Sequence, residues 1–179
     1  ITQGSWHTCA ITTEDTLVCW GMESFETEAT DGSFRAVSSH VDSYCGVLSD
    51  GTLWGDTYGT PPVFDDPVLD IDLGDYWACA LTEVGDVKCW NKWDESEELH
   101  LGDEDEIFTS VNVGYSHACG VQESGSIQCW NTHGDFDVDS PEGDFSEVSV
   151  GNHFTCARTT AGDVECWGSG AGASPPPEL

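Results

Sequence analysis

The sequence predicts an all-β protein made of five short repeats, most of them closed by a disulfide across a hairpin. A Cys, nine further residues, a second Cys and a Trp recur four times, beginning at Cys9, Cys79, Cys119 and Cys156. A fifth copy begins at Cys45, and the first cysteines of successive copies are 34 to 40 residues apart, which is the period of a repeat array. Within each copy, apolar and polar residues alternate around a turn, as they do in strands.

Each element of the repeat can be justified from the fourth copy. Residues 108–113 alternate between apolar and polar side chains and predict a first strand, which Gly114-Tyr115-Ser116 ends. Residues 117–122 predict a second strand, residues 123–125 a turn, and residues 126–130 a third strand. A long acidic loop then leads to the next copy.

A glycine occupies the predicted turn in four of the five copies. The positions are Gly51, Gly85, Gly125 and Gly162, and only the first copy has Glu14-Asp15 there instead. Glycine adopts a positive φ without the steric penalty of a Cβ atom, which is what a tight hairpin turn requires. The turn glycines therefore support a hairpin in every copy.

The two cysteines of a copy flank this turn symmetrically and so face each other across the hairpin. We therefore predict four disulfides within the repeats: Cys9–Cys19, Cys79–Cys89, Cys119–Cys129 and Cys156–Cys166. Each should stabilise its hairpin by about 2.5–3 kcal/mol on the chain-entropy view. Cys45 is expected to be an unpaired thiol, because Gly55 stands where its partner would be. Zinc is a poor alternative, because structural zinc sites use closely spaced ligand pairs.

The Trp that follows the second cysteine should point to the opposite side of the strand from that cysteine. Such a Trp is expected to pack between adjacent repeats, and an exposed aromatic used in binding is the alternative.

The net charge excludes several classes of function. The chain has 34 acidic residues and 4 basic ones, a formal net charge of −30. This surface repels nucleic-acid backbones and anionic lipid, so neither is an expected partner. The acidic residues either keep the protein soluble in a salty medium or attract cations or a basic partner.

The compartment follows from the cysteines and the apolar residues. Nine cysteines in paired spacing predict a secreted, extracellular or cell-surface protein. The apolar runs are far shorter than the ~20 residues that cross a bilayer, so membrane insertion is not expected. The first residue is Ile1, which fits a mature product whose signal peptide has been removed or a segment of a longer chain.

Two copies carry a family resemblance most clearly: Val111-NVGYSHACGVQESGSIQCW and Val148-SVGNHFTCARTTAGDVECW. They resemble the repeats of the regulator-of-chromosome-condensation family of β-propellers, including its secreted bacterial branch, which contains a β-lactamase inhibitor. The resemblance implies a single propeller over residues 1–179, with three to four strands in each blade. Its repeats would span about residues 1–30, 31–64, 65–106, 107–143 and 144–179. Members of this family usually have seven blades, and propellers with five are also permitted.

Two groups of side chains are candidate metal ligands. Asp135, Asp137 and Asp139 alternate along an acidic loop, as the first ligands of calcium loops do, although the glycine and glutamate that complete such a loop are missing. Calcium is therefore a tentative ligand there, and no cofactor is otherwise required. His7, His117 and His153 recur near the first cysteine of a copy, and we expect structural rings in preference to a metal site.

The sequence carries no recognisable catalytic arrangement, so we expect a protein that is not an enzyme. The leading hypothesis is an extracellular protein-binding or structural module, whose partner is another protein or a second copy. The alternatives are a soluble enzyme inhibitor or ligand-binding propeller, and a subunit that assembles head to tail into filaments. Residues 177–179 joined to Ile1-Thr2-Gln3-Gly4 would complete the first repeat, so we expect the ring to close within one chain.

Overall fold

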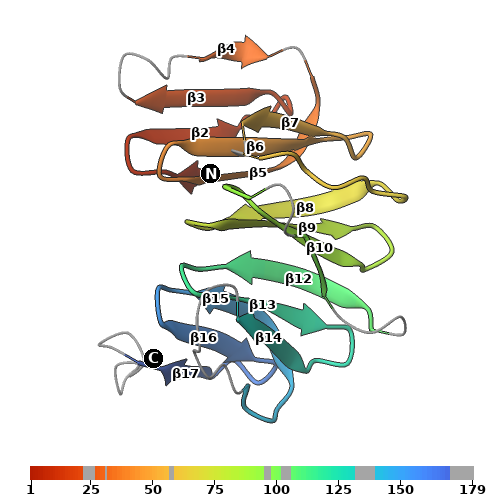
Figure 1. The fold of residues 1–179 in the computed structure, drawn as a ribbon, viewed down its shortest axis with the longest axis vertical. Coiled ribbons are helices and arrows are strands. Elements are labelled where there is room, and N and C mark those ends of the chain that lie inside the picture. The colour runs from red at the N-terminus through yellow and green to blue at the C-terminus, as the bar shows by residue number, and fades with distance from the viewer. Residues whose placement is uncertain are drawn as a thin grey trace.

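The computed structural model describes residues 1–21, 27–30, 32–56, 59–94, 98–101, 106–131 and 140–169. In these residues the only regular secondary structure is the β-strand (Figure 1). The strands form five antiparallel sheets, and in each sheet neighbouring strands follow one another along the chain. We call these sheets blades 1 to 5 in chain order.

Among the described residues, two blades have four strands and three blades have three. Blade 1 consists of β1 (Thr2–Gln3), β2 (His7–Ile11), β3 (Leu17–Gly21) and β4 (Thr27–Thr30). Blade 2 consists of β5 (Phe34–His40), β6 (Ser43–Leu48) and β7 (Leu53–Asp56). Blade 3 consists of β8 (Val68–Leu73), β9 (Trp77–Thr82), β10 (Val87–Asn91) and β11 (Glu98–Leu101). Blade 4 consists of β12 (Phe108–Val113), β13 (His117–Gln122) and β14 (Ile127–Asn131). Blade 5 consists of β15 (Phe145–Val150), β16 (Phe154–Thr159) and β17 (Val164–Gly168).

The second and third strands of each blade form the predicted hairpin. In four blades the two cysteines lie directly opposite each other in the strand register, and all four predicted disulfides are present. In blade 2 the residue opposite Cys45 is Gly55. The first copy, which lacks the turn glycine, places Asp15 in the left-handed region at a φ of 59°, so an aspartate takes over the conformation that glycine has elsewhere.

The core lies between the blades. Because side chains alternate across a strand, every blade has a face that carries its cysteines and an opposite tryptophan face. We call the first the disulfide face, also in blade 2, where it carries the free Cys45. The disulfide face of one blade packs against the tryptophan face of the next. Between blades 3 and 4 the buried residues are Cys79, Leu81, Val87 and Cys89 on one side, and Phe108, Val111, Val113 and Ala118 on the other. The predicted role of the Trp is seen at Trp90, which is buried in the interface between blades 2 and 3.

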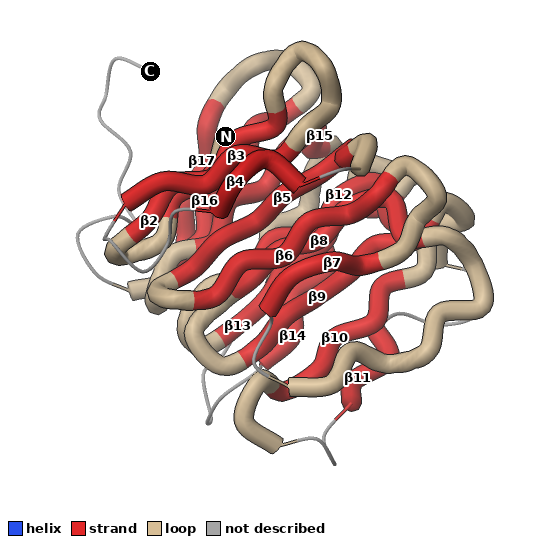
Figure 2. The backbone as a smooth tube through the Cα atoms, turned by 90° about the horizontal axis from the view of Figure 1, so that it is seen from above, coloured by secondary structure: helices blue, strands red, loops and turns tan. Residues whose placement is uncertain are grey.

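The five blades are stacked in order along the molecule. Blade 1 lies at one end of the stack and blade 5 at the other, while blades 2 to 4 fill the space between them (Figure 1). A view along the stack shows the strands of successive blades lying over one another (Figure 2). The described strands of blades 1 and 5 thus do not meet to close a ring. Residues 175–179, on which the expected closure depended, lie outside the described residues.

In the described part of the chain no helix is long and apolar enough to cross a membrane.

Candidate binding surface

The loops that join the first and second strands of the five blades lie side by side along one edge of the stack. They comprise residues 4–6, 41–42, 74–76, 114–116 and 151–153, and we call this edge the loop rim. Contacts between neighbouring blades hold it together. The Ser5 amide donates to the Val41 carbonyl (2.9 Å), and His40 Nε2 lies 3.1 Å from Asp75 Oδ2. The Ser116 hydroxyl donates to the Asn152 carbonyl (2.7 Å).

Aromatic side chains are concentrated on and beside the loop rim. Trp6 is 59% exposed, and Trp93, which lies two residues beyond the end of β10, is 63% exposed. The Tyr76 and Tyr115 rings meet edge to face with centroids 5.3 Å apart, and Tyr115 meets His153 in the same way at 5.8 Å. Exposed aromatic side chains on a rigid frame give much contact area for little loss of conformational entropy, so they are favoured in protein recognition.

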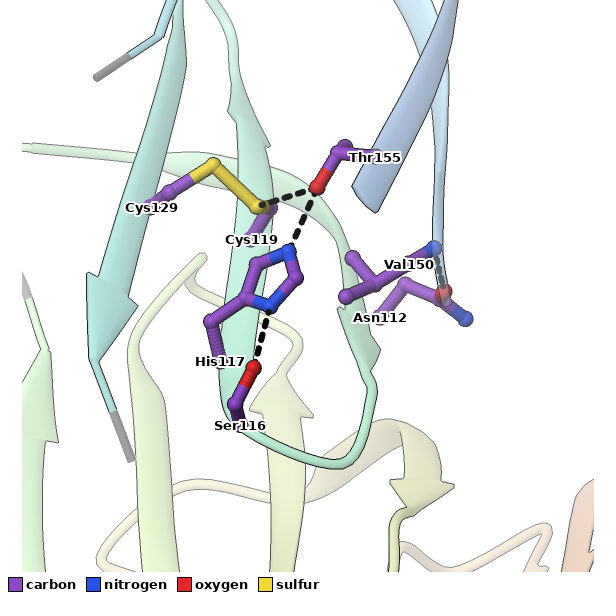
Figure 3. The surroundings of a disulfide bond; sticks show 7 residues. All are labelled: Asn112, Ser116, His117, Cys119, Cys129, Val150 and Thr155. Carbon is purple, nitrogen blue, oxygen red and sulfur yellow. Dashed lines mark hydrogen bonds between the residues drawn. A yellow bond between two sulfur atoms is a disulfide. The ribbon is translucent and has the colours of Figure 1, made fainter. Parts of the chain in front are cut away.

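Beneath the rim, a buried histidine joins blades 4 and 5. His117 Nε2 lies 2.6 Å from Thr155 Oγ1 and its Nδ1 lies 3.3 Å from Ser116 Oγ (Figure 3). Burial lowers the pKa of His117, and the nearby His153 lowers it further. A neutral imidazole can donate at one nitrogen and accept at the other, which suits two hydroxyl partners.

The three histidines do not converge on one site. The structure brings His117 and His153 together around Ser116, whereas His7 is buried at the other end of the stack beside Tyr44. The contacts of His117 favour the structural interpretation. In the described segments no three His, Cys, Asp or Glu side chains are grouped so that they could hold a metal ion.

A row of hydrogen bonds that the sequence analysis did not predict links the first strands of all five blades. In each link a polar side chain on one first strand accepts a hydrogen bond from a backbone amide on the next first strand. The four bonds are Ser39 N to Thr2 Oγ1 (3.0 Å), Leu73 N to Ser38 Oγ (3.1 Å), Val113 N to Asp72 Oδ2 (2.7 Å) and Val150 N to Asn112 Oδ1 (2.5 Å). We call this row the polar ladder. One signal could have revealed it, because every copy has a polar residue at this position of its first strand.

Asp72 is the most heavily bonded member of the polar ladder. Besides the Val113 amide, it accepts hydrogen bonds from the Ser38 hydroxyl (2.9 Å) and the Asn112 amide group (2.7 Å), so its carboxylate joins blades 2, 3 and 4. Withdrawal from water raises the pKa of Asp72 to about 6, although these hydrogen bonds favour the charged form.

The remaining predicted site residues do not form a site in the described structure. Cys45 is a free thiol buried between blades 2 and 3, and burial raises its pKa to about 12. A buried thiol of this kind is unreactive and is not a nucleophile. The tentative calcium ligands Asp135, Asp137 and Asp139 lie outside the described residues.

A depression of about 500 Å³ lies on the opposite edge of the stack, between the turn of blade 2 and residues 61–68. Its walls combine Phe64 and three prolines with Asp50, Asp65 and Asp66. This depression is a second concave surface, but it has fewer exposed aromatic side chains than the loop rim.

Comparison with known proteins agrees with the propeller fold. The family model for the regulator of chromosome condensation (RCC1) repeat matches residues 1–26. No curated protein sequence matches the chain. The WD40 ectodomain of the Arabidopsis thaliana receptor kinase ACR4 is similar in structure, with 26% identity, a TM-score of 0.73 and coverage of 93% of this chain and 61% of that one.

Two further solved structures are similar. The ectodomain of the Physcomitrella patens receptor kinase CR4 has 22% identity and a TM-score of 0.69, with coverage of 94% of this chain and 49% of that one. Prp20p of Saccharomyces cerevisiae, which was studied for its binding to Gsp1p and histones, has 13% identity and a TM-score of 0.70, with coverage of 91% and 56%. The chain thus spans 49% to 61% of the length of these three solved proteins.

Proposed function

We propose that this chain is an extracellular, non-enzymatic module that binds another protein through the loop rim. The observation that carries the proposal is the set of exposed aromatic side chains, above all Trp6 and Trp93, held on a frame of rigid blades. Ser5, next to Trp6, and Lys92, next to Trp93, donate hydrogen bonds to blade 2, so a partner would meet a preorganised surface.

The extracellular location rests on two supporting facts. The chain has four disulfides. Disulfides persist in oxidising compartments and are rare in the cytosol. Two of the similar structures are ectodomains of receptor kinases. The net charge of −30 favours a protein partner with a basic surface and opposes binding to nucleic acid or anionic membrane.

An inhibitory role is the second form of this proposal. An inhibitor of the kind that the family resemblance implies would use the same rim, with an enzyme as the bound protein. The two forms differ only in whether the captured partner loses an activity.

Site-specific photo-crosslinking tests the proposal. A photo-reactive amino acid placed at position 93 should form a covalent adduct with a protein of the native extracellular medium. The matched control has the same group at position 84, because Val84 is also exposed (50%) but lies on a hairpin turn. Once the partner is purified, Trp93→Ala should weaken its binding by at least about tenfold, as expected for a hot-spot aromatic. Adducts that form equally at positions 84 and 93, or at position 84 alone, would refute the role of the loop rim.

A further inference from the structure

The depression on the edge opposite the loop rim combines an apolar floor with acidic side chains. We call it the acidic groove, and its lining comprises residues 50–53, 61–62 and 64–68. Leu53, Phe64 and Val68 also pack in the core between blades 2 and 3, so the floor is part of the rigid frame. The acidic members of the lining are Asp50, Asp65 and Asp66. The volume of about 500 Å³ lies within the range of ~300–1,000 Å³ that is typical of ligand pockets.

The wall formed by residues 61–68 is held in place from both sides. Three of its eight residues are prolines, whose rings restrict φ. Lys88 Nζ donates a hydrogen bond to the Val63 carbonyl (2.9 Å), and the Val68 amide donates to the Gly51 carbonyl (3.1 Å). A ligand would therefore meet a preformed groove and would lose little free energy in ordering this wall.

The facing wall presents an oriented carboxylate. Asp50 Oδ1 accepts hydrogen bonds from the Thr52 hydroxyl (2.7 Å) and the Thr52 amide (2.9 Å), which hold the side chain beside the turn of blade 2. The same hydroxyl and amide lower the pKa of Asp50, because they stabilise its charged form. Asp50 therefore carries its negative charge at neutral pH.

The charges around the groove are not balanced within the chain. Among the described residues, none of its three aspartates forms an ion pair. Arg35, on blade 2, is paired with Glu83. Lys88 adds one positive charge beside the groove, with its ammonium group 5.7 Å from the centroid of the Phe64 ring. Three carboxylates thus outnumber one ammonium group, and the groove should attract a cation.

The shape and the spacing of the charges indicate what kind of cation fits. Within the residues that the structure describes, no three acidic side chains are grouped closely enough to hold a metal ion, so the carboxylates line the groove without converging. A ligand with separate positive charges on an apolar body matches this arrangement, and arginine and lysine side chains have such a charged head on an apolar stem. Asp50, Thr52 and Asp65 are exposed, so the groove is shallow. A shallow groove suits a chain segment that lies across it better than a small molecule, which needs most of its surface buried.

From these observations we propose that the acidic groove binds a short segment of a partner protein in which arginine or lysine alternates with apolar residues. The apolar side chains of the segment would cover Leu53 and Phe64, and its cationic groups would pair with Asp50 and Asp65. The groove and the loop rim lie on opposite edges of the stack, so this inference stands or falls independently of the proposed function.

Binding of a fluorescent peptide that alternates arginine and leucine tests the proposal by anisotropy. The measurement uses about 0.15 M NaCl, where the Debye length is about 8 Å, so that the distant charges of the chain are largely screened. Replacement of every arginine of the peptide by glutamine should weaken binding by at least about tenfold, because the ion pairs are lost. Replacement of every leucine by serine should have a similar effect, because the floor of the groove then has no apolar partner.

A pair of double variants locates the binding site. Asp50→Asn combined with Asp65→Asn should weaken binding of the arginine–leucine peptide by about tenfold, and asparagine at position 50 can still accept the hydrogen bonds from Thr52. The matched control combines Glu123→Gln with Asp163→Asn, which removes two exposed acidic groups from the turns of blades 4 and 5. Because the control loses the same charge, it should change the affinity by less than about twofold.

Three results would overturn the proposal. Equal weakening in the two double variants would show that the overall charge attracts the peptide. Unchanged affinity in the Asp50 and Asp65 double variant would place the peptide elsewhere on the protein. Equal affinity for the leucine and serine peptides would remove the role of the apolar floor. None of these variants alters the loop rim, so crosslinking from position 93 remains a separate measurement.

Discussion

At the scale of single residues, the carboxylate of Asp72 makes the stability of the folded state depend on pH. Asp72 bridges three blades and has a pKa raised to about 6 by its withdrawal from water. The folded state therefore binds a proton more readily than the unfolded state, in which an aspartate has a pKa of about 3.9. This contribution to stability is fully present below pH 4 and is lost as the pH rises through 6.

We predict that Asp72→Asn removes this pH dependence. The amide keeps the shape of the carboxylate but cannot ionise, so the stability of the variant relative to the wild type should rise by about 1–2 kcal/mol between pH 4 and pH 7.5, after allowance for solvent screening. Urea unfolding of both proteins at several pH values measures the difference, and the other titrating groups cancel in it. These include His7 and His117, whose lowered pKa values act in the opposite direction and favour the folded state above about pH 6.5. A constant difference between the two proteins across this range would contradict the role of Asp72.

At the scale of the elements, close backbone approach sets the spacing of the blades. A Cβ atom on Gly114 would lie 2.1 Å from the carbonyl oxygen of Gly151 in the next blade, and one on Gly74 would lie 2.4 Å from that of Gly114. These loops have no space for any side chain, so the glycine that ends the first strand is needed for packing between blades and not for its φ angle.

We therefore predict that Gly114→Ala destabilises the protein by about 2–3 kcal/mol, because the obstructing atom belongs to the backbone and the blades must move apart. Gly151→Ala is the matched control. The three atoms nearest to its Cβ would belong to the Phe154 ring of the same blade, the closest at 2.6 Å, and a half-buried ring can turn aside. Thermal unfolding of the two variants should show the larger loss for Gly114→Ala, and equal losses would argue against the backbone contact.

A second prediction at this scale concerns the blade without a disulfide. Gly55 lies opposite Cys45, but it has a φ of +125°, and a Cβ atom there would lie 2.5 Å from the Tyr44 carbonyl oxygen. Gly55→Cys should therefore fail to restore a fifth disulfide and should destabilise the blade by about 1–3 kcal/mol. Titration of the denatured, unreduced variant should find two thiols. A single new disulfide with a gain of about 2.5 kcal/mol would show instead that the strand adapts.

The elements themselves could largely be predicted from the sequence. The alternation in residues 108–113 and the symmetric cysteines fix the strands and the hairpin disulfides, because both are local properties of the chain. The polar ladder could not be predicted in the same way. Ser38, Asp72 and Asn112 are far apart in sequence and differ in chemistry, and their common role depends on how the blades dock.

At the scale of the whole molecule, three of the four basic side chains lie where they join parts of the stack. Arg35 forms an ion pair with Glu83 of the next blade, and Lys92 is buried, donating to Ser43 Oγ and to the Gly74 carbonyl at 2.9 Å each. Lys88 donates to the Val63 carbonyl at 2.9 Å. With only 4 basic residues against 34 acidic ones, most carboxylates have no cation to offset them.

We predict that salt stabilises the folded protein. Screening of the repulsion among acidic side chains should raise the melting temperature by about 3–6 °C between 10 mM and 500 mM NaCl, which corresponds to about 1–2 kcal/mol for a chain of this size. A melting temperature that stays flat or falls would indicate that the ion pairs between blades matter more than the overall charge.

The arrangement of the whole molecule is where sequence reasoning was least successful. Residues 177–179 match the lead-in that the first copy lacks, and this match led to the expectation of a ring closed within one chain. In the structure blades 1 and 5 lie at opposite ends of the stack (Figure 1). Whether the first and last blades meet depends on the rotation between each blade and the next. The repeat spacing does not encode that rotation.

The burial of Cys45 bears on the chemical lifetime of the molecule. A free thiol in a protein with four disulfides is an internal reagent for thiol exchange, which begins with attack by a thiolate. With a pKa of about 12, roughly one Cys45 in ten thousand is ionised at pH 8, and the apolar interface shields even that fraction. Separation of blades 2 and 3 removes both protections at once. A brief, reversible opening of that interface could then become a permanent reshuffling of cross-links, so the durability of the covalent framework depends on the tightness of a non-covalent contact.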